Sequence, residues 1–175
     1  MSTSITNIYN FIKLFMNNAL PINIVGDKIE NIYNILKISD SIATAGQPTA
    51  EQFLAVKNSG YQAVVNLALP KSLNALPDEQ AIVEAQGMDY VHIPVIWENP
   101  TLEDIKRFFT VMETNADKNV FVHCAANMRV SAFMYIYRLI HEHISEEDAK
   151  KDLQQIWVPN EIWQKFITQV IEFYQ

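Results

Sequence analysis

The residues around the chain's single cysteine have types and a spacing suited to phosphate chemistry. Cys124 follows His123 at the end of an apolar run, and Arg129 and Ser131 come five and seven residues after the cysteine. A thiol at a helix amino-terminus loses its proton more readily, because the helix dipole and the unpaired backbone N–H groups there favour an anion. The guanidinium of an arginine can bind two oxygens of one phosphate group. The segment therefore predicts a thiolate nucleophile beside an anion-binding loop.

Four apolar segments predict the strands of a sheet, and helical segments separate them. The strand segments are 42–45, 61–69, 89–95 and 119–123. Strands that alternate with helices build βαβ units, so we expect an α/β fold with a mainly parallel sheet of four to five strands, flanked by helices. Ligands bind outside the carboxyl ends of parallel strands, and Cys124 directly follows the last of these segments.

Capping signatures and turn residues indicate where the helices begin. A Ser or Thr followed three residues later by Gln or Asp satisfies the first backbone N–H groups of a helix. This pattern occurs three times, at Thr49 with Gln52, at Thr101 with Asp104 and at Ser145 with Asp148. A fourth helix start is indicated by Asn160, which follows a proline. The segment from Pro77 to Gly87 predicts a further helix. The run after Arg129 is apolar on almost every side, which predicts a helix buried inside the domain.

The first 30 residues are predicted to form an amino-terminal helical extension of a domain that spans 31–175. Apolar residues recur there at helical spacing and predict an amphipathic helix that ends near Pro21, namely Ile5, Ile8, Ile12, Phe15 and Met16. Polar residues interrupt the apolar run and no small-residue cleavage site follows, so the segment does not resemble a secretion signal. A second helical run is predicted from about Lys28 to Ile38.

Composition and charge narrow the class of protein. The chain has 175 residues, 49% hydrophobic and 19% charged, which is typical of a single folded domain with a sizeable core. With 13 basic and 20 acidic residues the net charge is −7, so we expect neither nucleic acid nor an anionic membrane as a partner. A single cysteine excludes an internal disulfide and favours a reducing, cytoplasmic location. No group of side chains predicts a metal site, and the oligomeric state does not follow from the sequence.

Three further segments resemble those of a known enzyme family. GQPT at 46–49, HIPV at 92–95 and VHC at 122–124 occur in this order along the chain. With the cysteine segment, they resemble the cysteine-dependent protein tyrosine and dual-specificity phosphatases, in particular a compact bacterial group. The resemblance covers residues of about 35 to 160. It implies a dual-specificity-phosphatase-like fold and hydrolysis of a phosphomonoester without a metal or organic cofactor. The substrate would be a phosphotyrosine, phosphoserine or phosphothreonine protein, or a small phosphate ester.

The same resemblance implies a role for each residue of the cysteine segment. Cys124 is expected to be the nucleophile that forms a phosphocysteine intermediate. Arg129 is expected to bind the phosphate, Ser131 to help the thiolate leave when water attacks, and His123 to tune the thiol from behind. Backbone N–H groups of the loop and the first helical turn are expected to surround the phosphate oxygens, namely those of Ala125, Ala126, Asn127, Met128 and Val130.

The general acid of the family is an Asp on the loop before the helix that precedes the cysteine strand. In this sequence that loop reads WENP and contains no Asp. Glu98 is the carboxylate of the loop, whereas Glu103 and Asp104 belong to the first turn of the predicted helix. Glu98 is therefore the predicted proton donor to the leaving oxygen.

The spacing of the arginine departs from the family pattern and leaves two other functions open. Arg129 lies five residues after Cys124 where the phosphatases have six, and Val130 occupies the usual arginine position. One residue turns a helical side chain by about 100°. A Cys-x4-Arg loop has the length found in rhodanese-like sulfurtransferases, in which the cysteine carries a persulfide. A further alternative is a non-catalytic phosphate-binding or interaction module.

Overall fold

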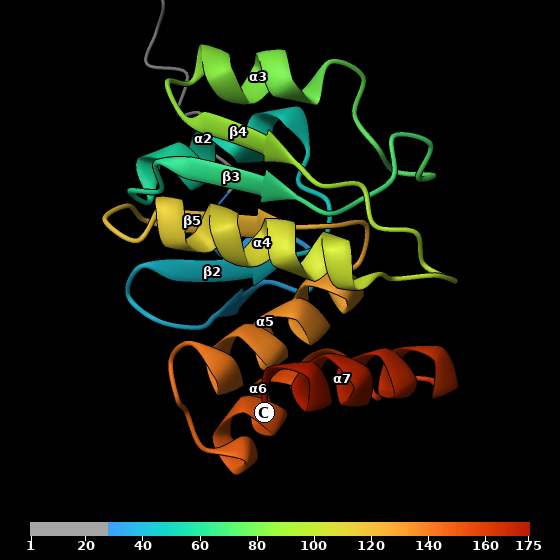
Figure 1. The fold of residues 1–175 in the computed structure, drawn as a ribbon. Helices are drawn as coiled ribbons and strands as arrows, with labels where there is room; N and C mark the ends of the chain where they lie inside the picture. The colour runs from blue at the N-terminus through green and yellow to red at the C-terminus, as the bar shows by residue number, and fades with distance from the viewer. Residues whose placement is uncertain (1–27) are drawn as a thin grey trace, which may run out of the picture.

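A five-stranded sheet forms the centre of the protein (Figure 1). The computed structural model describes residues 28–175. Across the sheet the strand order is β1-β2-β5-β3-β4, with bounds β1 Leu36–Lys37, β2 Ile42–Ala45, β3 Ala63–Asn66, β4 Asp89–His92 and β5 Val120–His123. β2, β5, β3 and β4 are parallel, whereas the short edge strand β1 is antiparallel to β2. The predicted α/β fold with a mainly parallel sheet is confirmed.

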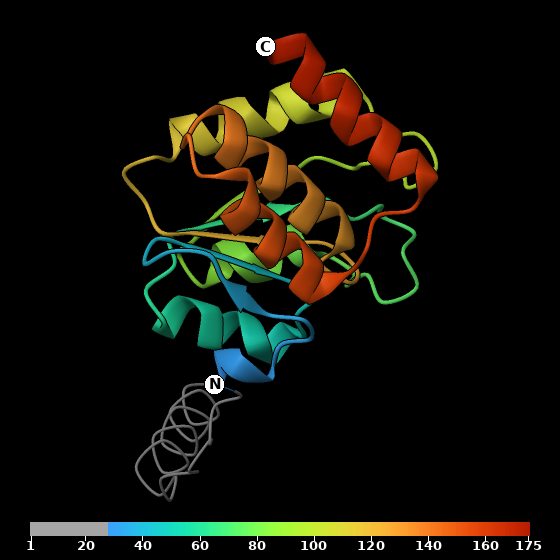
Figure 2. The same cartoon turned by 90° about the horizontal axis from the view of Figure 1, so that it is seen from below.

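Helices cover both faces of the sheet (Figure 2). One face carries the 3-10 helix η1 (Ile29–Asn31), α2 (Ala50–Asn58) and α3 (Glu79–Ala85). The other carries α4 (Leu102–Thr114), α5 (Met128–Ile140), α6 (Glu146–Ile156) and α7 (Glu161–Tyr174). The first two turns of α5 are buried, as the apolar pattern predicts. Within the described residues, no helix is long and apolar enough to cross a membrane.

The predicted helix starts are confirmed by their capping hydrogen bonds. Thr49 and Gln52 form a reciprocal capping box at α2, and Thr101 and Asp104 form another at α4. At the start of α6, the Ser145 side chain accepts a hydrogen bond from the backbone N–H of Asp148. At the start of α7, the Asn160 side chain accepts one from the backbone N–H of Trp163. These bonds satisfy donors that an isolated helix end leaves unpaired.

The helix predicted from about Lys28 to Ile38 is wrong. The chain forms only the short η1 there and then pairs as β1, with Leu36 opposite Thr44 of β2. Asn34 adopts a left-handed conformation with φ of 50°, which ends any right-handed helix. The amphipathic helix predicted before Pro21 lies outside the described residues.

The carboxyl ends of the parallel strands lie in one row. Ala45 of β2 lies opposite His123 of β5, His123 lies opposite Asn66 of β3, and Asn66 lies opposite His92 of β4. The loops that follow these four residues therefore begin at one edge of the sheet. This edge is where a doubly covered parallel sheet places its ligands.

We expect the protein to lose stability when the capping box of α4 is removed. Thr101→Ala deletes the hydroxyl that accepts from the Asp104 backbone N–H at 3.2 Å. We expect the free energy of unfolding in urea to fall by about 1 kcal/mol. Thr110→Ala is the matched control, because this exposed threonine lies in the interior of the same helix. Equal losses in the two variants would contradict a specific role of the cap.

Candidate active site

Cys124 lies at the carboxyl end of β5, between the loops that follow β2 and β3. Its backbone N–H donates to Ala45 O at 3.3 Å, and its side chain is only 1% exposed, within the apolar cluster that includes α5. Side chains alternate along a strand, so His123 points to the opposite face, where its ring meets Phe53 of α2 edge-on at 5.8 Å between centroids. The His123 and Cys124 side chains therefore lie on opposite faces of the sheet.

Two carbonyl groups of the cysteine loop accept hydrogen bonds from neighbouring segments. Ala125 O accepts from the Gln47 backbone N–H at 3.3 Å and from Asn74 Nδ2 at 2.9 Å, and Ala126 O accepts from Asn34 Nδ2 at 3.1 Å. In a trans peptide the N–H points opposite to the C=O, and the structure contains no cis peptide among the described residues. In the peptide between Ala125 and Ala126, the N–H group therefore points away from Gln47 and Asn74.

The GQPT turn packs directly against this loop. Gly46 forms an isolated antiparallel bridge with Ala126. A Cβ added at Gly46 would lie 2.8 Å from Tyr33 Cδ1 and 3.2 Å from Ala125 O. Only glycine leaves room for this close approach of two backbone segments. The first residue of the predicted motif thus has a packing role beside the cysteine loop.

Asn127 turns the loop into helix α5. It is the N-cap residue in a left-handed conformation, with φ of 64°. Its side chain forms no capping bond, and its Nδ2 donates instead to Asn34 O at 2.8 Å and to Thr44 Oγ1 at 2.9 Å. The first intrahelical bond is from Ser131 N to Asn127 O at 2.9 Å. The N–H groups of residues 128–130 precede this bond, so they have no partner within the helix.

Arg129 is buried beside the loop that contains the predicted acid. It is 8% exposed, and its guanidinium carbon lies 5.7 Å from the centre of the Trp97 ring. Within residues 28–175 no carboxylate pairs with it, and its Nε has no hydrogen-bond partner. A buried guanidinium without an acid is unfavourable unless an anion or an aromatic face compensates its charge. The cationic end of Arg129 is thus available to an anion.

Ser131 and the WENP loop are held by tryptophans of the carboxyl-terminal helices. The Trp97 ring contacts the rings of Trp157 and Trp163 in tilted arrangements, with ring centres 5.2 Å and 5.3 Å away. Trp157 Nε1 donates to Ser131 Oγ at 3.1 Å, and Trp163 Nε1 donates to Trp97 O at 3.0 Å. These contacts place the end of α6 and the start of α7 against the first turn of α5.

The hydroxyl hydrogen of Ser131 already forms a hydrogen bond within α5. Ser131 Oγ donates to Met128 O at 3.0 Å, and a hydroxyl has one hydrogen to give. The role that the family resemblance implies, a hydrogen bond to the leaving thiolate, requires this hydroxyl to turn away from Met128.

The predicted acid, Glu98, directly follows Trp97 on the loop and is exposed. The structure therefore brings the loop of the predicted acid to Arg129.

Glu79 is a buried residue of the site region that the sequence analysis did not identify. It is 6% exposed at the start of α3, and four side chains converge on its carboxylate. His123 Nε2 lies 3.0 Å from Oε1, Asn66 Nδ2 donates to Oε1 at 2.7 Å, the Tyr90 hydroxyl donates to Oε1 at 2.9 Å, and Gln47 Nε2 donates to Oε2. An acidic residue in a first helical turn ordinarily indicates only a favourable dipole interaction, so no sequence signal distinguished it.

These hydrogen bonds keep Glu79 ionised. Burial by itself would raise the pKa of the Glu79 carboxyl, but the bonds from His123, Gln47 and Tyr90 outweigh it and hold the pKa below its ordinary value. Burial and the neighbouring carboxylate raise the pKa of Tyr90. An ionised carboxylate only accepts hydrogen bonds, so His123 carries a hydrogen at Nε2. Its Nδ1 is buried and has no partner among the described residues.

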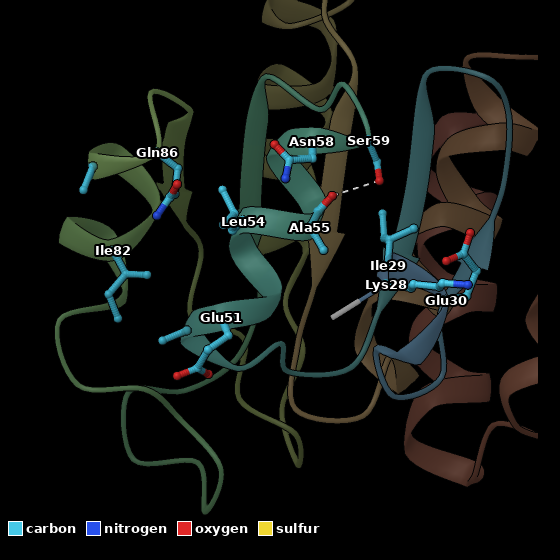
Figure 3. A pocket seen from close by; sticks show the side chains of 12 residues that line it. Lys28, Ile29, Glu30, Glu51, Leu54, Ala55, Asn58, Ser59, Ile82 and Gln86 are labelled. Atoms are coloured by element: carbon cyan, nitrogen blue, oxygen red, sulfur yellow. Dashed lines mark hydrogen bonds between the residues drawn. The ribbon is translucent and has the colours of Figure 1, made fainter. Parts of the chain in front are cut away.

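A separate pocket contains none of the predicted site residues. It has a volume of about 850 Å³ and lies between η1, α2 and α3 (Figure 3). Its α2 residues, among them Glu51 and Leu54, belong to the side of the helix away from the sheet, since Phe53 and Val56 fill the core. Figure 3 shows Leu54 and Ile82 on its two walls, from α2 and α3. Within the described residues, no cluster of His, Cys, Asp or Glu side chains could hold a metal ion.

Comparison with known proteins connects this arrangement to phosphatases. A family model described as "DSP-PTPase phosphatase fused to NAD+ Kinase" matches residues 28–165. The crystal structure of a candidate phosphatase (DUF442) from Shewanella putrefaciens CN-32 is 35% identical, with a TM-score of 0.76, and the match covers 83% of this chain and 96% of that one.

Other relatives are more distant or much longer. Tk-PTP in its active form is 18% identical with a TM-score of 0.68, and the match covers 79% of this chain and 96% of that one, which shows a shared fold. The beta-lactamase hydrolase-like protein of Xylella fastidiosa (strain Temecula1) is 26% identical over 119 residues, or 66% of this chain. The chain matches only 27% of the length of that curated relative.

The ionised Glu79 predicts a loss of stability in acid. A carboxyl whose pKa is lower in the folded state stabilises the protein fully above its unfolded value of about 4.3, and this contribution disappears as the pH falls through the folded value. In urea unfolding at a series of pH values, the wild type should lose stability below about pH 4.3 more steeply than Glu79→Gln. Glu103→Gln removes an exposed carboxyl of α4 and controls for total charge. Parallel curves for the wild type and Glu79→Gln would contradict this prediction.

Proposed function

We propose that this chain, which belongs to the family described as DSP-PTPase phosphatase fused to NAD+ kinase, hydrolyses phosphomonoesters through a phosphocysteine intermediate. One observation carries the proposal. The backbone N–H groups of residues 128–130 have no partner within α5, and they lie at the amino-terminus of this helix, at the end of the loop that begins at Cys124. Such a row of donors binds a phosphate-like anion.

In the first chemical step, the thiolate of Cys124 attacks phosphorus. The sulfur–phosphorus bond forms as the bond from phosphorus to the leaving oxygen breaks. The loop N–H groups and the Arg129 guanidinium would stabilise the charge on the three remaining phosphoryl oxygens. Arg129 is suited to this, because no carboxylate in the described residues neutralises it. The Trp97 ring holds its guanidinium carbon at 5.7 Å from the ring centre.

The leaving oxygen must receive a proton during this step. Glu98 is the carboxylic acid that we assign, because its neighbour Trp97 contacts Arg129 directly. In the second step, a water molecule gives a proton to Glu98 and attacks the phosphocysteine. The sulfur–phosphorus bond breaks, inorganic phosphate leaves and the thiolate returns. Ser131 would turn its hydroxyl from Met128 O to the sulfur at this point.

The substrate class that we propose is a phosphorylated protein, carrying phosphotyrosine, phosphoserine or phosphothreonine, or a small phosphate ester. The reaction needs only the chain's own side chains and water. A thiolate nucleophile remains reduced in the cytoplasm, where disulfides are rare, so we expect the reaction there.

Hydrolysis of p-nitrophenyl phosphate tests the proposal. The wild type should release phosphate, Cys124→Ser should release none, and vanadate should inhibit the wild type. Arg129→Lys should lower kcat/KM about a hundredfold, because the loss of one positioned donor pair to the transition state has this order of effect. Arg107→Lys is the matched control, because Arg107 is an exposed arginine on α4. No release from folded wild-type protein would instead support the phosphate-binding module, and consumption of thiosulfate would support the sulfurtransferase.

The role of Glu98 has its own test. Glu98→Gln cannot protonate the leaving oxygen, so we expect kcat to fall about a hundredfold for an alkyl phosphate, whose leaving oxygen needs the proton. The loss should be smaller for p-nitrophenyl phosphate, because nitrophenolate leaves without a proton. Glu103→Gln, a carboxylate five residues further along on α4, is the control. Equal losses for the two substrates would exclude Glu98 as the acid.

A further inference from the structure

Glu79 connects the two residues that flank Cys124. On one side, its Oε1 is bonded to Nε2 of His123, the residue immediately before Cys124. On the other side, its Oε2 accepts from Nε2 of Gln47, whose backbone N–H donates to Ala125 O, the residue immediately after Cys124. One buried carboxylate thus reaches both neighbours of the cysteine through two intermediate residues.

The remaining partners of Glu79 lie on β3 and β4. Asn66 Nδ2 donates to Glu79 at 2.7 Å while Asn66 Oδ1 accepts from Ala68 N at 2.7 Å, which shapes the start of the loop after β3. The Tyr90 hydroxyl, from β4, donates to Glu79 at 2.9 Å. The partners therefore come from four neighbouring strands or the loops after them, and these loops begin at the edge where the cysteine lies.

We propose that Glu79 is a positioning residue that holds the cysteine loop in its anion-binding shape, through His123 before the cysteine and through Gln47, which bonds Ala125 after it. The carboxylate does not touch the substrate in this role. It fixes the ring of His123 and the side chain of Gln47, and these in turn fix the orientation of the peptides that flank Cys124. The inference rests on the proposed function only for the anion-binding property of this loop.

The direction in which Glu79→Gln changes the affinity for an anion separates this positioning role from a simple effect of charge. Glu79→Gln retains the size of the side chain but removes a negative charge near the anion site. By charge alone, its removal should strengthen the binding of an anion. Loss of loop geometry should weaken it, because the amide Nε2 faces side chains that donate, and at least one of the two links to the loop breaks. Weaker binding in the variant therefore reports positioning.

The test is a calorimetric titration of the full chain with sodium tungstate, a phosphate-like oxyanion that requires no turnover. We expect Glu79→Gln to bind tungstate about tenfold more weakly than the wild type, with a parallel loss in kcat/KM. Tyr90→Phe is the matched control, because it removes a hydrogen bond to the same carboxylate from β4, which does not lead to the cysteine loop. Its affinity should stay within about twofold of the wild type.

Each other outcome has a defined meaning. Equal or tighter binding in Glu79→Gln overturns the proposal, as does an equal loss in Tyr90→Phe, which would indicate general loosening of the core. If Glu79→Gln does not fold, Gln47→Met removes one of the two links, and unchanged tungstate binding in that variant overturns the proposal. Wild-type protein that binds no tungstate overturns it also. Wild-type protein that binds tungstate without hydrolysing phosphate contradicts only the phosphatase activity and leaves this test intact.

Discussion

A carboxylate that leaves water is costly unless hydrogen-bond donors replace its hydration, and the donors around Glu79 are the ends of the sheet itself. Gln47, Asn66, Tyr90 and His123 belong to four neighbouring strands or the loops after them, and all of them turn a donor toward one side chain. One buried carboxylate therefore joins side chains from four neighbouring strands or the loops after them. The cysteine loop starts from that edge, so its shape depends on how the carboxylate is satisfied.

A second set of contacts holds the site from the opposite face of the sheet. Trp157 bonds the Ser131 hydroxyl, and Trp163 bonds the Trp97 carbonyl. Trp97 in turn lies under the guanidinium of Arg129. The last two helices therefore form part of the site, because they fix both the loop of the predicted acid and the first turn of α5. Arg129, one residue earlier than the family's arginine, contacts this aromatic ring, and no carboxylate within residues 28–175 pairs with it.

Local sequence signals predicted most of the helices and strands correctly, but they missed the pairing of β1 with β2, which joins separate segments of the chain. The capping boxes at Thr49 and Thr101 involve residues three apart, so the sequence shows them directly. The helix expected from about Lys28 to Ile38 failed because β1 exists only by pairing with β2, and because Asn34 turns left-handed where its side chain bonds the Ala126 carbonyl. Helical spacing of apolar residues carries no information about either contact.

The sequence by itself determined that a lone cysteine follows a buried strand and precedes a buried helix, because hydrophobic periodicity and the succession of elements are local properties. These properties also place the arginine just before that helix and the serine in its first turn. Only the tertiary structure decided that Arg129 lies on Trp97, that Ser131 bonds Trp157, and that Glu79 reaches both neighbours of Cys124 through His123 and Gln47. The reason is physical: each of these contacts joins residues far apart in the chain, and their partners are chosen by which loops meet at the edge of the sheet.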